Sequence, residues 1–123
     1  MKIAAVQMIS GPEVAPNLAT AARLIDRAAG DGATLVALPE YFPLIGASDT
    51  ERLAVRETDG AGPIQEFLAA KAKQHGIWVV GGSLPLLAND AGKLRNTSLI
   101  YDPKGVQVAR YDKVHLFGFH KGE

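Results

Sequence analysis

The chain has 123 residues, and its 13 lysine and arginine residues balance 13 aspartate and glutamate residues, so its formal net charge is zero. That length and a hydrophobic content of 47% fit one globular domain and argue against disorder, while the zero charge gives no electrostatic reason to expect nucleic acid or an anionic membrane as partner. The absence of cysteine excludes disulfides, thiolate metal sites and a thiol nucleophile within these residues.

The first part of the chain predicts a strand, a helix and a second strand. Residues 2–9 are mostly apolar and predict a buried strand. This run is too short for a signal-peptide core, and no apolar run could span a bilayer, so a cytoplasmic location is expected. Apolar residues then recur at three- and four-residue steps, which predicts a helix with Asn17 as its N-cap and a stop at residues 30–32. The apolar strand over residues 35–38 should end at Pro39, because proline lacks a ladder donor.

The middle of the chain predicts a second long helix and a third strand. Between residues 43 and 57 the pattern favours a loop and a short helical piece. Pro63 suits the first position of a helix and Gly76 suits its end, so a helix is predicted between them. Residues 77–80 are wholly apolar and predict a buried strand, with Trp78 in the core.

The last part of the chain predicts a β-hairpin. Its strands are expected over residues 96–101 and 106–111, joined by residues 102–105. The connecting tetrad has aspartate first, proline second and glycine fourth, which is typical of a type I turn. Apolar strands that alternate with amphipathic helices favour a single α/β layered domain.

Glu40 is the first candidate functional residue, because it follows a buried strand that ends at Pro39. Ligands bind in the crevice beyond the carboxyl ends of strands in α/β sheets, and a carboxylate beside aromatic rings could shuttle protons near neutrality. The alternative is a loop carboxylate that caps a turn. Tyr41 and Phe42 could line a pocket or pack the core.

Lys113 is the second candidate. Strand alternation places Lys113 and Tyr111 on one side of the strand, and Asp112 and Val114 on the other. A lysine at this strand end could stabilise a developing oxyanion, or it could be an edge-strand lysine that blocks aggregation. His115 is expected to be a packed or hydrogen-bonded neighbour of the lysine.

Two classes of cofactor find no support in the sequence. The three histidines lack metal-ligand spacing, so no metal is expected. The segment after the first strand has no glycine-rich phosphate loop, so no nucleotide cofactor is expected.

Several segments together resemble the nitrilase superfamily of carbon–nitrogen hydrolases, in the branch that includes omega-amidases and deaminated-glutathione amidases. Two of them resemble catalytic motifs of that family, and three more resemble its strands and hairpin. These segments are 38–42 and 111–117 for the motifs, and 4–8, 75–83 and 95–105 for the rest. The resemblance implies that residues 1–123 are a partial domain, the first half of an α-β-β-α sandwich, and that full-length members form homodimers or higher oligomers.

The resemblance also implies roles within a Glu-Lys-Cys triad. Glu40 would be the general base, and Lys113 would stabilise the tetrahedral intermediate. Glu123 is the candidate for a second glutamate of the family, and the cysteine nucleophile is expected beyond residue 123. Tyr41, Phe42 and His115 are the candidate substrate-pocket residues. No cofactor is implied.

Two function hypotheses follow. The first is an amidase that cleaves a small non-peptide amide or nitrile through a cysteine thioester, with residues 1–123 inactive alone. The alternative is a non-catalytic nitrilase-like protein that binds a partner or regulates a homologue. A generic α/β binding module would be expected to show phosphate-loop chemistry, which is absent.

Overall fold

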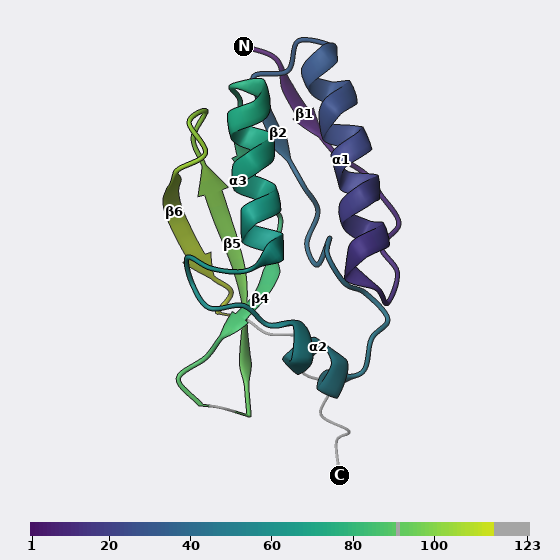
Figure 1. The fold of residues 1–123 in the computed structure, drawn as a ribbon, viewed down its shortest axis with the longest axis vertical. Coiled ribbons are helices and arrows are strands. Elements are labelled where there is room, and N and C mark those ends of the chain that lie inside the picture. Colours follow the sequence, from purple (N-terminus) through teal and green to yellow (C-terminus); the bar gives the residue numbers. More distant parts are fainter. Residues whose placement is uncertain (91, 115–123) are drawn as a thin grey trace.

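The computed structural model describes residues 1–90 and 92–114, which form a mixed α/β fold (Figure 1). The α/β prediction is therefore confirmed. The elements in chain order are β1 (Ile3–Ala5), α1 (Val14–Gly30), β2 (Leu35–Ala37), α2 (Asp49–Val55), α3 (Pro63–His75), β3 (Trp78–Val80), β4 (Leu84–Leu87), β5 (Leu94–Tyr101) and β6 (Gln107–Asp112).

The strands form one six-stranded sheet in the order β1-β2-β3-β5-β4, with β6 also paired to β5. β1, β2 and β3 are mutually parallel, and β5 runs antiparallel to β3, β4 and β6. Val80 at the end of β3 pairs with Ile100, and Asp112 at the end of β6 pairs with Thr97. The carboxyl ends of β2, β3 and β6 therefore point toward the same end of the sheet, the end at which β5 begins.

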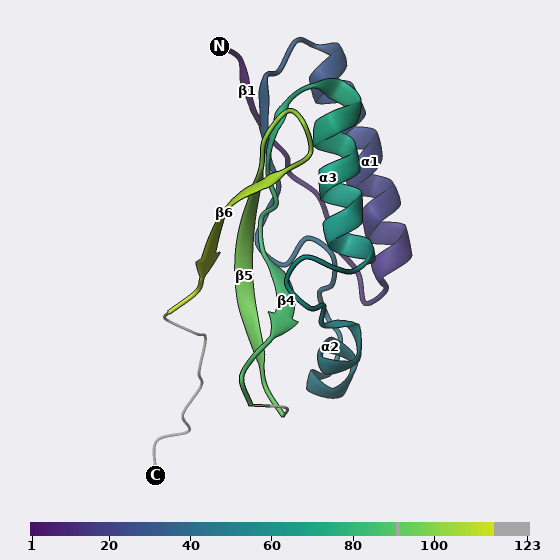
Figure 2. The same cartoon turned by 60° about the vertical axis from the view of Figure 1, so that its left-hand side comes forward.

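Helices α1 and α3 lie on one face of this sheet, and α2 lies near its end beside β4 (Figures 1 and 2). Val36, Val79 and Leu99, from three neighbouring strands, face the helices and are fully buried. Ile25 of α1 and Leu68 of α3 are buried against them in one hydrophobic cluster. Apolar stripes at helical spacing thus pack on strand residues at period two, which is the physical basis of the layered fold.

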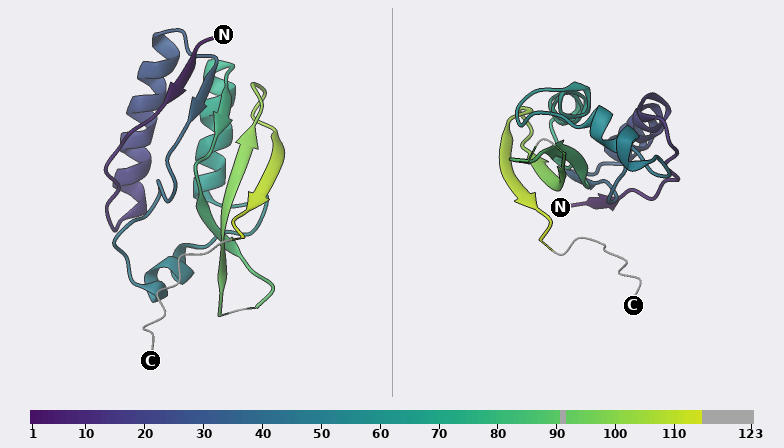
Figure 3. Two further views of the ribbon diagram at one scale, coloured as in Figure 1. Left: turned by 180° about the vertical axis from the view of Figure 1, so that it is seen from behind. Right: turned by 90° about the horizontal axis from the view of Figure 1, so that it is seen from below.

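The opposite face of the sheet carries exposed apolar side chains. No helix covers that face in the described part of the chain, as the view along the strands shows (Figure 3). Ile3 is 62% exposed, Trp78 39% and Tyr111 63%. The prediction that Trp78 lies in the core is therefore wrong, because its register with Ile3 and Leu35 places it on the uncovered face.

Asn17 is not the N-cap of α1. The helix begins at Val14, and Asn17 is a buried residue of its first turns. The Asn17 side chain accepts a hydrogen bond from the Gly11 N–H at 2.9 Å and donates to the Gly11 and Pro43 carbonyls, each at 2.8 Å. The Asn17 amide thus joins the Gly11 and Pro43 loop backbones, which is a long-range role that local capping patterns do not reveal.

The strands differ from their predicted lengths. β1 has three residues, after which the Val6 N–H still donates to the Ala37 carbonyl at 2.9 Å. β4 is not among the strands predicted from the sequence. It contains Pro85, which pairs with Asn96 of β5. The predicted turn is confirmed by a 2.9 Å hydrogen bond from the Gly105 N–H to the Asp102 carbonyl.

The short helical piece predicted between residues 43 and 57 is α2, which begins after Ser48. The Ser48 hydroxyl accepts from the Glu51 N–H, and the Glu51 carboxylate accepts from the Ser48 N–H, which together form a capping box. None of the helices in the described ranges has both the length and the hydrophobicity needed to cross a membrane.

Candidate active site

Glu40 lies in the turn that follows β2, at the carboxyl end of the parallel strands. Tyr41, the next residue, has φ 55°, the single positive value among the described non-glycine residues. Its N–H donates to the Ser83 hydroxyl at 2.8 Å, and the Phe42 N–H donates to the Pro39 carbonyl at 3.2 Å. A left-handed tyrosine is unfavourable by itself and persists where its surroundings hold it. These contacts turn the chain away from the direction of β2 immediately after Pro39.

Lys113 lies just past the end of β6. The pairing of Asp112 with Thr97 fixes the register of this strand on β5. The Lys113 N–H then donates to the Asn96 carbonyl at 2.9 Å, which extends the ladder by one residue. The backbone at Lys113 is therefore held by β5.

The side chains of Lys113 and Glu40 meet across 73 positions of sequence. Lys113 Nζ donates to Glu40 Oε1 at 2.6 Å, a short contact between charged groups, and charge-assisted hydrogen bonds are shorter and stronger than neutral ones. The hydrogen bond to the Glu40 carboxylate raises the pKa of Lys113 above its ordinary value. The side chains are 35% and 53% exposed, respectively, so water screens the pair and it contributes little to folding stability. This pair brings together the two sequence-predicted catalytic residues.

Glu40 and Lys113 share a cavity of about 270 Å³ on the uncovered face of the sheet. Its wall combines apolar strand residues with hydroxyl, amide and charged groups. The lining residues are Leu38, Glu40, Val80, Gly82, Ser83, Asn96, Ser98, Tyr111 and Lys113. The predicted placement of Tyr111 on the same side as Lys113 is confirmed. A carboxylate and an ammonium in one concave site can move a proton and stabilise an oxyanion.

The two aromatic residues after Glu40 do not line this cavity. Phe42 is fully buried, and its ring centroid lies 6.5 Å from that of Phe67, so it packs the core. The Tyr41 ring lies beneath the Arg52 guanidinium, 5.9 Å from centroid to carbon. Of the two alternatives, the structure places Phe42 in the core, and it places Tyr41 beside α2. Neither of the two rings that follow Glu40 in the sequence therefore lines its cavity.

Two other candidates, His115 and Glu123, lie outside the described residues. Within residues 1–90 and 92–114, no cluster of three histidine, cysteine, aspartate or glutamate side chains could hold a metal ion.

Sequence reasoning missed Ser83 and Asn96 as site residues. Ser83 fixes the Tyr41 backbone, and the Asn96 side chain donates to Glu40 Oε1 at 3.1 Å. One local signal was present, since an asparagine within a predicted strand disfavours that structure unless its amide has a partner.

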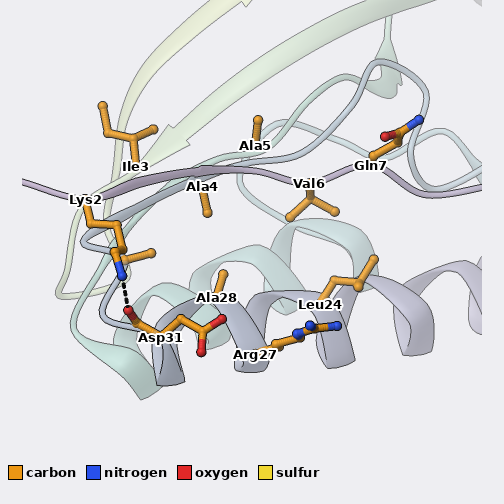
Figure 4. Close-up of a pocket in the computed structure, with 11 residues that line it drawn as sticks. Lys2, Ile3, Ala4, Ala5, Val6, Gln7, Leu24, Arg27, Ala28 and Asp31 are labelled. Atoms are coloured by element: carbon orange, nitrogen blue, oxygen red, sulfur yellow. Dashed lines mark hydrogen bonds between the residues drawn. The ribbon is translucent and has the colours of Figure 1, made fainter.

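A second cavity, of about 360 Å³, lies between β1 and the end of α1 and shares no residue with the first (Figure 4). Ala4 and Val6 point toward Leu24 and Ala28 of the helix. Lys2 Nζ donates to the Asp31 carbonyl at 2.6 Å, at the edge of this hollow. None of the sequence-predicted site residues lines this cavity, so its larger volume does not make it the candidate site.

Asp112, beside Lys113, should make folding stability depend on acid pH. Hydrogen bonds from Arg110 at 2.9 and 3.2 Å, and from Thr97 at 2.8 Å, lower the pKa of Asp112. Its contribution is present above the ordinary aspartate pKa, and is lost as the pH falls through the lowered value. Asp112→Asn should therefore reduce the free energy of unfolding by roughly 1 kcal/mol at pH 7, and by less near pH 2.

Urea unfolding at the two pH values measures this difference. Asp49→Asn is the matched control, because the Asp49 side chain is 97% exposed and its loss should matter little at either pH. An equal effect of Asp112→Asn at both pH values would contradict the assignment.

Known proteins resemble this chain in both sequence and fold. The family model described as carbon–nitrogen hydrolase matches residues 2–123. The chain belongs to the carbon–nitrogen hydrolase family. At family level these are hydrolases that act on carbon–nitrogen bonds other than peptide bonds, and the fold matches nitrilase-superfamily structures.

Individual carbon–nitrogen hydrolases resemble the chain over nearly its whole length. A deaminated glutathione amidase of Synechocystis is 42% identical over 115 residues, which are 93% of this chain and 42% of that protein. Omega-amidase NIT2-A of Xenopus laevis is 37% identical over 116 residues, 94% of this chain and 41% of that protein.

Solved structures agree with the sequence relatives. The C. elegans NitFhit protein has a TM-score of 0.77 and 34% identity, over 96% of this chain and 29% of that one. An amidase from Nesterenkonia sp. has a TM-score of 0.79 and 28% identity, over 96% of this chain and 44% of that one. The chain thus spans less than half the length of these relatives.

Proposed function

We propose that residues 1–123 carry the glutamate and the lysine of an amidase site that hydrolyses a small non-peptide amide or nitrile through a cysteine thioester. Glu40 is the general base: it takes the thiol proton, gives it to the departing ammonia, and then activates the hydrolytic water. Lys113 stabilises the negative oxygen of the tetrahedral intermediate. The thiol comes from a segment outside residues 1–123, because these residues contain no cysteine.

The observation that carries this proposal is the 2.6 Å contact between Lys113 Nζ and Glu40 Oε1 in one cavity. Amide and nitrile carbons are poor electrophiles, so a thiolate nucleophile needs both a base and an oxyanion partner. The cavity lies on the uncovered face of the sheet, where a further segment can supply the nucleophile. A structure of the Nesterenkonia amidase contains acrylamide added at its active-site cysteine, which supports this nucleophile.

Ammonia release tests the proposal with two proteins. One is residues 1–123 alone. The other, the extended enzyme, continues with the sequence encoded after residue 123 or, where the gene supplies none, with the remaining part of the Synechocystis relative. We expect the extended enzyme to release ammonia from a small carboxylated amide and to form an acyl-cysteine seen by mass spectrometry.

We expect residues 1–123 alone to release no ammonia above background. Turnover by the short chain at a rate similar to that of the extended enzyme would overturn the missing-thiol proposal. Binding of the amide by the extended enzyme with no acyl-cysteine and no ammonia would favour the non-catalytic binding or regulatory alternative.

We also propose that the extended enzyme forms a homodimer or a higher oligomer, as the family resemblance implies. Light scattering after sizing chromatography measures its mass directly. We expect at least twice the mass of one chain, and a monomer across the micromolar range would contradict this proposal.

A further inference from the structure

Asn96 is the most deeply buried polar residue in the wall of the Glu40–Lys113 cavity. It lies in β5 and is 2% exposed, although burial of a primary amide is unfavourable unless its polar atoms find partners. We propose that Asn96 is a positioning residue that holds Glu40 and Lys113 in register with each other. This role deepens the proposed amidase function and rests on it for its catalytic meaning.

Asn96 contacts both members of the pair, through different atoms. The backbone carbonyl of Asn96 accepts from the backbone N–H of Lys113 at 2.9 Å. The side-chain Nδ2 of Asn96 donates to Glu40 Oε1 at 3.1 Å. Lys113 Nζ donates to the same oxygen at 2.6 Å. The three residues therefore form a closed cycle, in which the spacing between base and lysine is set by one residue of the central strand.

The orientation of the Asn96 amide follows from this cycle. Exchanging the amide oxygen and nitrogen would place Oδ1 against Glu40 Oε1, and two acceptors repel each other. In the observed orientation Oδ1 is buried and has no hydrogen-bond partner within the described ranges. The contact to Glu40 therefore fixes an amide that is otherwise only partly satisfied.

The two carboxylate oxygens of Glu40 differ in their hydrogen bonds. Both donors, Asn96 Nδ2 and Lys113 Nζ, reach Oε1. No hydrogen bond to Oε2 comes from the described part of the chain. Asn96 thus anchors the carboxylate by one oxygen and leaves the other as the acceptor for a proton, as a general base requires.

NMR of the Asn96 side chain tests the first contact without substrate and without changing Asn96. The sample is residues 1–123, or the extended enzyme if the short chain self-associates. Glu40→Ala removes the acceptor, so the Asn96 amide signals should shift and exchange with solvent roughly tenfold faster. Glu66→Ala, which removes an exposed carboxylate of α3, is the control and should leave them unchanged.

Titration of Lys113 tests whether Asn96 acts through Glu40. The groups near this ammonium are the Glu40 carboxylate and the Tyr41 phenol, and Tyr111 lines the same cavity. Asn96→Ala should let the pKa of Lys113 fall toward the ordinary lysine value, since Glu40 loses one of its two anchors. In a Glu40→Gln background the same substitution should have no further effect on Lys113.

Ser98→Ala is the matched control, because Ser98 lies on the same strand and lines the same cavity. It should leave the Lys113 titration unchanged. In the extended enzyme, Asn96→Ala should lower kcat by about tenfold with little change in KM, whereas Glu66→Ala, on α3 and outside the cavity, should not.

Two results would overturn the proposal. One is an Asn96 amide that does not respond to Glu40→Ala, which decides the matter even if Asn96→Ala fails to fold. The other is an Asn96→Ala protein with a lower melting temperature but an unchanged Lys113 titration, which would mean a structural role only. An extended enzyme without amidase activity but with both NMR responses would refute the proposed function and leave the positioning role in place.

Discussion

Replacing Lys113 with alanine should lower kcat of the extended enzyme by about 10²–10³-fold, the usual effect of removing one oxyanion partner. Replacing Glu40 with glutamine should lower it by about 10²–10⁴-fold, because the amide keeps the shape of the carboxylate but cannot accept the thiol proton. Steady-state ammonia release measures both effects. The two losses should not add in the double variant, because the residues act in one mechanism.

Matched variants separate these effects from general damage. Lys104→Ala removes an exposed lysine from the turn between β5 and β6, and Glu66→Gln changes an exposed carboxylate of α3. Both should keep turnover within about twofold of the parent, because exposed substitutions change stability little. Near-parent rates for Lys113→Ala or Glu40→Gln would remove that residue from the proposed site.

Gly82→Ala should be the most damaging single-methyl substitution near the site. Gly82 has φ 57°, and a Cβ there would clash with the Pro39 carbonyl oxygen and lie 2.8 Å from that of Leu38. Both are backbone atoms of the segment that leads into Glu40, so they cannot move without moving the base. We expect a loss of about 3 kcal/mol or more in the free energy of unfolding, from the left-handed backbone and the overpacking together.

Gly76→Ala is the control that divides this loss into its two causes. Gly76 ends α3 with φ 63°, and a Cβ there meets nothing within 4 Å. Gly76→Ala should therefore lower the free energy of unfolding only by the cost of a left-handed alanine backbone, about 1 kcal/mol. Urea unfolding compares the two variants. Equal losses would mean that the close approach of Gly82 to the Pro39 carbonyl does not constrain the site.

The sequence by itself determined the elements whose causes are local. The hairpin turn follows from aspartate, proline and glycine at fixed positions, and α3 follows from Pro63 at its start and Gly76 at its end. Strand alternation was enough to place Tyr111 on the side of Lys113. Glu40 was found as a candidate because a buried strand stops one residue before it.

Other features were decided only by the tertiary structure. The contact between Glu40 and Lys113 joins residues 73 positions apart, and the contact from Asn96 to Glu40 spans 56. Trp78 is exposed because no helix of the described chain covers its face of the sheet. Asn17 is buried, and its amide donates to the carbonyl of Pro43, 26 positions away. Propensity and periodicity act over a few residues, whereas these contacts depend on strand order and register. The absence of cysteine, which first excluded a thiol, gains its meaning from that geometry, because a glutamate and a lysine share a cavity whose described lining contains no thiol.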